Sequence, residues 1–157
     1  MRAACYVPLK LVRAPPGWVV VSRHYPKLRA FGRTRAKAMA QAEELVLDGV
    51  RAMVALKRVP PGLGEPLNDG EVAVHLPLVL AAKLALMVAL QEAGARTNAD
   101  ACGLLGIGDK HLRTLLDPYG TTKAGNIEAQ LNKLGVKLTL GFEVCASARN
   151  LTRPTLP

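Results

Sequence analysis

The sequence predicts an α+β fold, in which a small β-sheet with one long helix is linked to a module of shorter helices and a final strand. Three observations lead to this prediction. Short runs of β-branched and aromatic residues alternate with turn residues at the start of the 157-residue chain, which is typical of strands. One long stretch with helical spacing of its apolar residues follows. The second half contains several shorter helical stretches and then a strictly alternating run.

The strands of the first unit, residues 1–58, are separated by turns. We predict these strands at residues 5–12, 18–21 and 27–31. A Pro-Pro-Gly turn divides the first two, and the proline inside the first strand suits the edge of a sheet.

A long helix completes this unit. Apolar residues recur at helical spacing from Thr34 to about Lys57, and Thr34 is suited to cap the helix N-terminus. Residues 59–75 form a linker rich in proline and glycine. The last five of them, 71–75, alternate briefly and indicate a fourth strand.

The helical module is expected over residues 76–145, before a loose tail at 146–157. Its first helix, residues 78–93, is apolar nearly all round, which implies burial on most sides. Gly135 is expected as the residue that follows the last helix. The three shorter helices are predicted at 97–105, 109–116 and 126–134.

Positive charge is concentrated at the start of the chain. The protein has 21 Lys and Arg against 12 Asp and Glu, a formal net charge of +9. Nine of these cations and no carboxylate fall within residues 1–37, so the remainder of the chain is balanced. Such an excess points to a polyanionic partner, usually nucleic acid.

Residues 97–116 have the pattern of a helix-turn-helix, in which the second of two steeply crossing helices enters the major groove of DNA. Cys102 is small enough for the crossing point, and Gly106 tolerates the positive φ that the turn needs. An ordinary helical hairpin is the alternative, because this spacing alone is a weak signal. The flanking helices and the cations in register favour DNA binding, with operator DNA as the partner and transcriptional repression as the function.

The DNA-contacting residues are expected around the start of the recognition helix. Lys110 and Arg113 lie three residues apart on one helix face, where they reach base edges or phosphates. Asp109 either caps the helix or accepts a hydrogen bond from a cytosine. The full predicted set is Thr97, Asn98, Gly108, Asp109, Lys110, Arg113, Thr114 and Lys123.

Several stretches resemble the HicB-type antitoxins that have a C-terminal helix-turn-helix. The run LLDPYGTTKAGNIEAQLNKLG, residues 115–135, is similar to that family's recognition helix, basic loop and amphipathic helix. GWVV at 17–20 and GRT at 32–34 resemble its second strand and helix start. The resemblance implies a partial RNase H-like unit at residues 1–58. It also implies an antitoxin that neutralises a small RNA-cleaving, HicA-like toxin and represses its own operon.

The first unit departs from that pattern in its charge. Arg33 stands where the resemblance implies an acid, and a surface without carboxylates would repel a basic toxin. Three alternatives for this basic surface therefore stay open: a toxin, an anionic partner other than a toxin, and plain solvation of the cations. Three cations in the first turn of a helix oppose its dipole at about 0.3 kcal/mol or more each, which an anionic partner would offset. The patch consists of Arg23, Lys27, Arg29, Arg33, Arg35 and Lys37.

No enzymatic chemistry is expected. An RNase H-like nuclease holds divalent metal on clustered carboxylates, whereas the first acid of this chain is Glu43, on the long helix. The three histidines and three cysteines are scattered, so no catalytic dyad, metal site, cofactor or disulfide framework is expected. The longest apolar stretch, residues 76–90, contains Lys83 and is too short for a membrane span. We expect a cytoplasmic protein with reduced thiols.

A homodimer, or a higher even oligomer, is expected through the C-terminal half, because two modules read a palindrome with half-sites about one helical turn apart. Residues 136–144 alternate between apolar and polar and predict a half-buried strand. The unpaired edge of this strand is expected to pair with the same strand of a second chain. Packing of the strand against its own chain is the alternative. The predicted interface is Leu80, Leu84 and Met87 on the first helix and Val136, Leu138, Leu140, Phe142 and Val144 on the strand.

Overall fold

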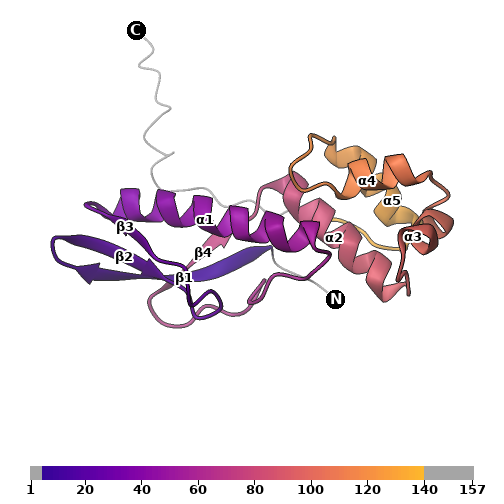
Figure 1. Cartoon of the computed structure of the whole chain (residues 1–157). Coiled ribbons are helices and arrows are strands. Elements are labelled where there is room, and N and C mark those ends of the chain that lie inside the picture. Colours follow the sequence, from indigo (N-terminus) through magenta and orange to yellow (C-terminus); the bar gives the residue numbers. More distant parts are fainter. Residues whose placement is uncertain (1–4, 140–157) are drawn as a thin grey trace, which may run out of the picture.

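An antiparallel sheet under one long helix is joined end to end with a group of shorter helices (Figure 1). The computed structural model describes residues 5–139. This arrangement confirms the predicted α+β class. In chain order the elements are β1 (Tyr6–Ala14), β2 (Gly17–Val21), β3 (Ala30–Gly32), α1 (Arg35–Ala55), β4 (Glu71–His75), α2 (Leu78–Glu92), α3 (Asn98–Leu105), α4 (Asp109–Leu116) and α5 (Ala124–Lys133).

The sheet has the strand order β3-β2-β1-β4, with every neighbouring pair antiparallel. Helix α1 lies along one face of it (Figure 1). One apolar row on α1, with its members four residues apart, is buried against apolar residues that alternate along the strands. The helix contributes Ala38, Ala42, Val46, Val50 and Val54, and the strands contribute Val7, Leu9, Val20, Ala30 and Val74.

Strand β1 is central, whereas its proline predicted an edge. Both observations are compatible, because β4 pairs with Tyr6–Lys10 and β2 pairs with Lys10–Ala14. Pro8 therefore has a strand neighbour on the β4 side only, and its missing N–H costs no hydrogen bond to β2. The predicted fourth strand is confirmed as β4.

The third strand begins later than the sequence indicated. Residues 27 and 28 lie in a turn, where the N–H of Leu28 donates to the carbonyl oxygen of Tyr25 at 2.9 Å. The strand is therefore Ala30–Gly32, three residues long. The prediction failed because KLRAF has strand-like composition, while this hydrogen bond closes its first half into a turn.

Helix α2 belongs to two hydrophobic cores at once. Leu80, Leu84 and Met87 pack into the core between the sheet and α1. Its opposite side, with Leu86 and Leu90, packs against α3, α4 and α5. This double burial explains why the helix is apolar nearly all round. It also makes α2 a rigid connection between the sheet unit and the shorter helices.

The predicted dimer interface is corrected in part by this packing. Leu80, Leu84 and Met87 are at most 5% exposed within a single chain, so they offer no surface to a partner. The sequence could not show that α1 and the sheet cover them. Residues 136–139 form no strand, although Val136 and Leu138 are partly buried against the second core. Leu140, Phe142 and Val144 lie outside the described residues.

Candidate nucleic-acid interface

Helices α3 and α4 are the two short helices expected over residues 97–116, joined by a tight turn. Gly106 adopts the left-handed conformation at φ 64° and ψ 38° and ends α3. The carbonyl oxygen of Cys102 accepts hydrogen bonds from the N–H groups of Gly106 and Ile107, at 2.8 and 3.2 Å. Leu105 and Leu112, one from each helix, are buried in the second core. A residue with a side chain would be strained at Gly106, so the turn depends on glycine there.

The N-terminus of α3 is closed by a reciprocal pair of hydrogen bonds between Thr97 and Asp100. The Thr97 hydroxyl accepts from the N–H of Asp100 at 3.2 Å, and the Asp100 carboxylate accepts from the N–H of Thr97 at 2.9 Å. The N–H of Arg96 donates to the same carboxylate. Hydrogen bonds from Thr97 and then from Arg96 lower the pKa of Asp100. Thr97 is therefore a helix cap whose side chain is already engaged.

Helix α4, the expected recognition helix, begins after Gly108 and presents its polar residues to solvent. Lys110 and Thr114 are exposed, and the Thr114 hydroxyl donates to the carbonyl oxygen of Lys110 at 3.0 Å. Arg113 is 72% exposed, and its Nε lies 2.7 Å from Asp109 Oδ2. The sequence left Asp109 open between a cap and a base contact; in the structure it pairs with Arg113.

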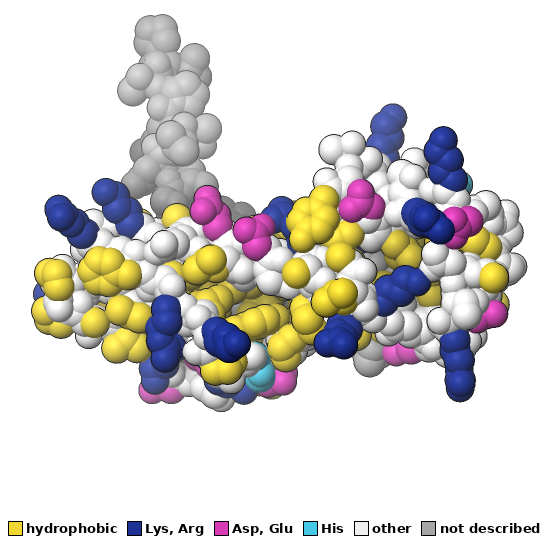
Figure 2. All heavy atoms as spheres, in the orientation of Figure 1, with side chains coloured by type: hydrophobic (Ala, Val, Ile, Leu, Met, Phe, Trp, Pro, Cys, Tyr) yellow, Lys and Arg dark blue, Asp and Glu magenta, His cyan; other side chains and the backbone are white. Residues whose placement is uncertain are grey.

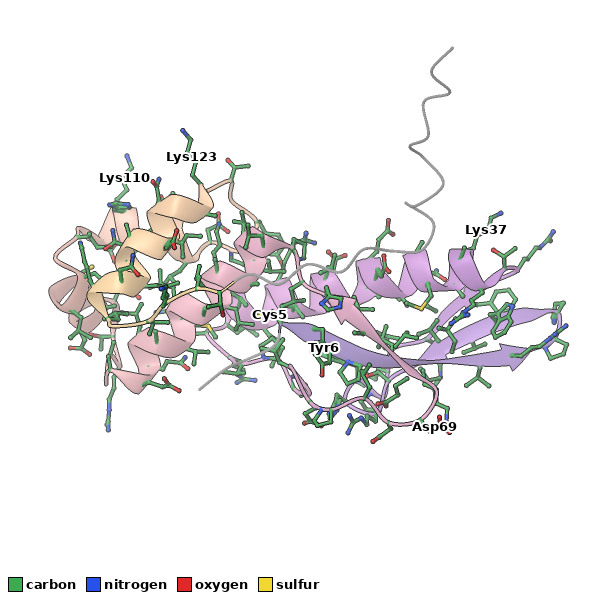
Figure 3. The ribbon with its side chains drawn as sticks, turned by 180° about the vertical axis from the view of Figure 1, so that it is seen from behind. Cys5, Tyr6, Lys37, Asp69, Lys110 and Lys123 are labelled. Carbon is green, nitrogen blue, oxygen red and sulfur yellow. The ribbon has the colours of Figure 1, made fainter. Side chains whose placement is uncertain are left out.

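Lys123 extends this surface beyond α4. It precedes the first residue of α5 and is exposed. Figure 3 shows Lys110 and Lys123 projecting outward at the same end of the molecule. The fold therefore gathers on one side the cations that the sequence assigned to base and backbone contacts.

Two lysines outside the predicted set support this surface. The buried Lys83 of α2 donates to the carbonyl oxygens of Asp117 and Gly120, just after α4. Lys57, at the end of α1, donates to Asn98 Oδ1 at 2.5 Å. The sequence contains a signal for Lys83, because a lysine inside an apolar helix indicates that its ammonium has buried hydrogen-bond partners. Nothing in the sequence marks Lys57, because its partner lies 41 residues away.

The N-terminal basic patch is smaller than predicted. Arg23 Nε lies 3.1 Å from Glu71 Oε1 and Nη1 lies 3.1 Å from Glu65 Oε2, so both carboxylates neutralise this guanidinium. Arg23 therefore leaves the patch, since the fold brings it acids more than 40 residues away. The remaining members are all exposed: Lys27, Arg29, Arg33, Arg35 and Lys37.

This patch lies far from the recognition helix. Figure 3 shows Lys37 at one end of the molecule and Lys110 at the other. Helix α1 runs between them, and its 21 residues span about 30 Å. Figure 2 shows Lys and Arg side chains at both ends. One chain therefore offers two separate cationic surfaces.

Among residues 5–139, no group of three or more His, Cys, Asp or Glu side chains is placed to hold a metal ion. None of the helices within that range has the length and apolar character needed to cross a membrane.

Two curated proteins are similar to this chain over most of its length. It is 28% identical over 133 residues to "Antitoxin HicB 2" of Photorhabdus laumondii subsp. laumondii, across 85% of this chain and 93% of that protein. It is 27% identical over 133 residues to "Antitoxin HicB" of Pseudomonas fluorescens, across 84% and 90%. No family model matches the chain. The two relatives support the HicB-type antitoxin family, which the sequence motifs resemble.

Proposed function

We propose, from its similarity to HicB antitoxins along most of the chain, that this protein is the antitoxin of a toxin–antitoxin pair and a DNA-binding repressor of its own operon. In this proposal it is a cytoplasmic regulator and not an enzyme. Its two activities are divided between its two ends, with operator DNA at the helix-turn-helix and a small RNA-cleaving, HicA-like toxin at the sheet unit.

The observation that carries the DNA-binding proposal is the exposed polar face of α4. Lys110 and Arg113 extend from it into solvent, while Leu112 and Leu115 on the opposite face are buried. This division leaves the cationic face free to enter a major groove. Thr97 and Asn98, at the start of α3, and Lys123, at the start of α5, flank it for contacts to phosphates.

Repression through a palindromic operator needs two such modules, so we propose a homodimer. Within residues 136–139, Val136 and Leu138 pack against the second core of their own chain, while Lys137 and Thr139 are exposed. This is the alternation of a half-buried strand. A two-fold copy of the strand would supply the pairing that this chain does not supply within residues 136–139.

The sheet unit is the proposed site of toxin binding, and its charge is more mixed than the sequence indicated. The fold adds the exposed Asp69 and the partly exposed Glu65, both from the linker, to a unit whose first 37 residues carry no acid, whereas the Glu71 side chain of β4 is 6% exposed and paired with Arg23. A basic toxin would therefore meet carboxylates on this unit, away from the cations of the α1 N-terminus. An acidic partner at Lys27, Arg29 and the start of α1 is the second candidate, since those side chains are exposed.

DNA binding is tested by selecting duplexes from a random library with the full chain and titrating the selected duplex. Arg113→Ala is expected to cost about 1–3 kcal/mol of binding free energy if Arg113 makes a specific base contact. Lys37→Ala, which removes a cation at the opposite end, is the control and should bind as the wild type does. An unchanged affinity in the Lys110→Ala/Arg113→Ala double variant would remove α4 from the interface.

Toxin neutralisation is tested by coexpression with the product of any small neighbouring gene. An antitoxin should form a tight complex with that product and restore growth of the cells that make it. A chain that selects an operator but has no such neighbour is a stand-alone regulator, which is the alternative function.

A further inference from the structure

Four side chains form a continuous polar connection from the end of α1 to the recognition helix. Lys57 Nζ donates to Asn98 Oδ1 at 2.5 Å, and Asn98 Nδ2 donates to Asp109 Oδ1 at 3.2 Å. The other oxygen of Asp109, Oδ2, lies 2.7 Å from Arg113 Nε. The connection joins α1, α3 and α4.

The order of donors and acceptors fixes the direction of each group. The Asn98 amide must turn its oxygen to the Lys57 ammonium and its nitrogen to the Asp109 carboxylate, because the reverse orientation sets like against like at both ends. Aspartate at position 98 would oppose Asp109, so the amide is the group that fits. Arg113 uses its Nε on Asp109 and keeps the four N–H donors of its Nη groups for other partners.

Lys57 itself is held in place by its backbone. It has the left-handed φ of 55°, and its N–H donates to the carbonyl oxygen of Val54 at 2.9 Å. Its own carbonyl oxygen accepts from Gln91 Nε2 of α2 at 2.9 Å. The backbone of Lys57, from which the side chain extends toward Asn98, is therefore held by both α1 and α2.

We propose that Lys57 is a positioning residue for DNA recognition, which orients the Arg113 guanidinium through Asn98 and Asp109. The inference rests on the proposed function, since it assumes that Arg113 reads DNA. An arginine held in one direction before binding loses less side-chain freedom when it meets a base. Exposed ion pairs of this kind contribute little to folding stability. The effect that we assign to this connection is therefore on the orientation of the Arg113 guanidinium and not on the stability of the fold. The sheet unit thereby takes part in reading DNA through a residue that touches none.

The test compares Lys57→Met with Arg58→Met in the full-length protein. Both variants remove one exposed cation at the end of α1, but only Lys57 donates to Asn98. The first measurement uses the free protein. In nitrogen-15 NMR spectra, Lys57→Met should shift the Arg113 Nε–Hε and Asn98 Nδ2 signals, Arg58→Met should leave them in place, and Lys57→Arg should restore the Asn98 signal. Unmoved signals in Lys57→Met would overturn the connection.

The second measurement uses a duplex selected from a random library by the wild-type protein and a scrambled duplex of the same composition. Lys57→Met should lower the ratio of the two affinities by about fivefold or more, because a loosely held arginine discriminates bases less well. Its salt dependence should equal that of Arg58→Met.

Two results of this second measurement would overturn the inference alone. One is an unchanged affinity ratio in Lys57→Met. The other is an equal loss on both duplexes, with the salt slope reduced by about 0.9 relative to Arg58→Met, which identifies Lys57 as a phosphate contact. A wild-type protein that selects no sequence would instead overturn the proposed function, and the inference with it.

Discussion

The Lys83 Nζ lies 2.8 Å from the carbonyl oxygen of Gly120, 37 residues further along the chain. The same ammonium donates to the carbonyl oxygen of Asp117, and Lys83 is only 1% exposed. A single side chain from α2 therefore holds the segment that follows α4. The Asp117 oxygen also accepts from the N–H of Gly120 at 3.3 Å, so Lys83 adds a second donor there and a donor to the Gly120 oxygen.

Lys83→Met should reduce the free energy of unfolding by about 1–3 kcal/mol at neutral pH, because the thioether fills the space of the stem but cannot donate to the two carbonyl oxygens. Burial lowers the pKa of Lys83, and the carboxylate of Asp117 partly opposes this. The unfolded chain then keeps this proton to a higher pH than the folded one. The stability of the wild type relative to Lys83→Met should rise with pH between the lowered pKa and 10.5.

Urea unfolding of both proteins over this pH range measures the difference. Subtracting the unfolding free energy of Lys83→Met from that of the wild type removes the contributions of the tyrosines and of the other lysines. A difference that stays flat with pH would contradict the lowered pKa of Lys83, and equal stability at neutral pH would contradict the role of its two hydrogen bonds.

Gly106→Ala should destabilise the protein by about 1–2 kcal/mol, the cost of a left-handed residue with a Cβ. An added Cβ meets no atom within 4 Å, so this cost comes from the backbone alone. Gly103→Ala is the matched control, because Gly103 lies inside α3 with equally open space. It should stabilise by up to about 1 kcal/mol through helix propensity. Changes of the same sign in thermal unfolding would contradict this assignment of the turn.

Reversal of Arg33 and Arg35 to Glu should leave the affinity for the selected duplex unchanged at physiological salt. These residues lie at the far end of α1 from α4, well beyond the Debye length of about 8 Å. The same variant should elute from heparin at lower salt than the wild type, because the patch binds polyanions without reading sequence. Unchanged heparin elution would mean that these cations are merely solvated and bind no anionic partner. A loss of duplex affinity would mean that the patch contacts DNA.

A chain ending at Gly135 should sediment as a monomer at micromolar concentration, whereas the full chain should sediment as a dimer. The truncation removes the strand predicted at residues 136–144, and among the described residues it takes from the second core the partly buried Val136 and Leu138. Circular dichroism of the shortened chain controls for its folding. A shortened chain that is folded and still dimeric would place the interface elsewhere.

Local features of the fold were predictable from the sequence. Thr34 caps α1 and Gly106 ends α3, as predicted, and Thr97, where the second helix was expected to start, caps α3. These features depend on hydrogen bonds and dihedral angles within a few residues, so the nearby sequence contains their cause. The helical spacing of α1 and α4 was likewise visible, because one face of each is buried.

Three other features were decided by the tertiary structure. Arg23 looked like part of a free patch until the fold placed Glu65 and Glu71 beside it. Leu84 looked available for a dimer until the sheet unit covered it. Lys57 looked like a solvated charge until Asn98 was placed within reach of its ammonium. Each outcome depends on a contact between residues more than 20 positions apart. The sequence by itself determined the helices, the cap of α1 and the glycine that ends α3, because those choices are local, whereas it placed strand at residues 27–28 and 136–139, where the structure has none. Only the tertiary structure decided which charges and apolar surfaces remain free for partners, because burial and ion pairing depend on what the rest of the chain brings alongside.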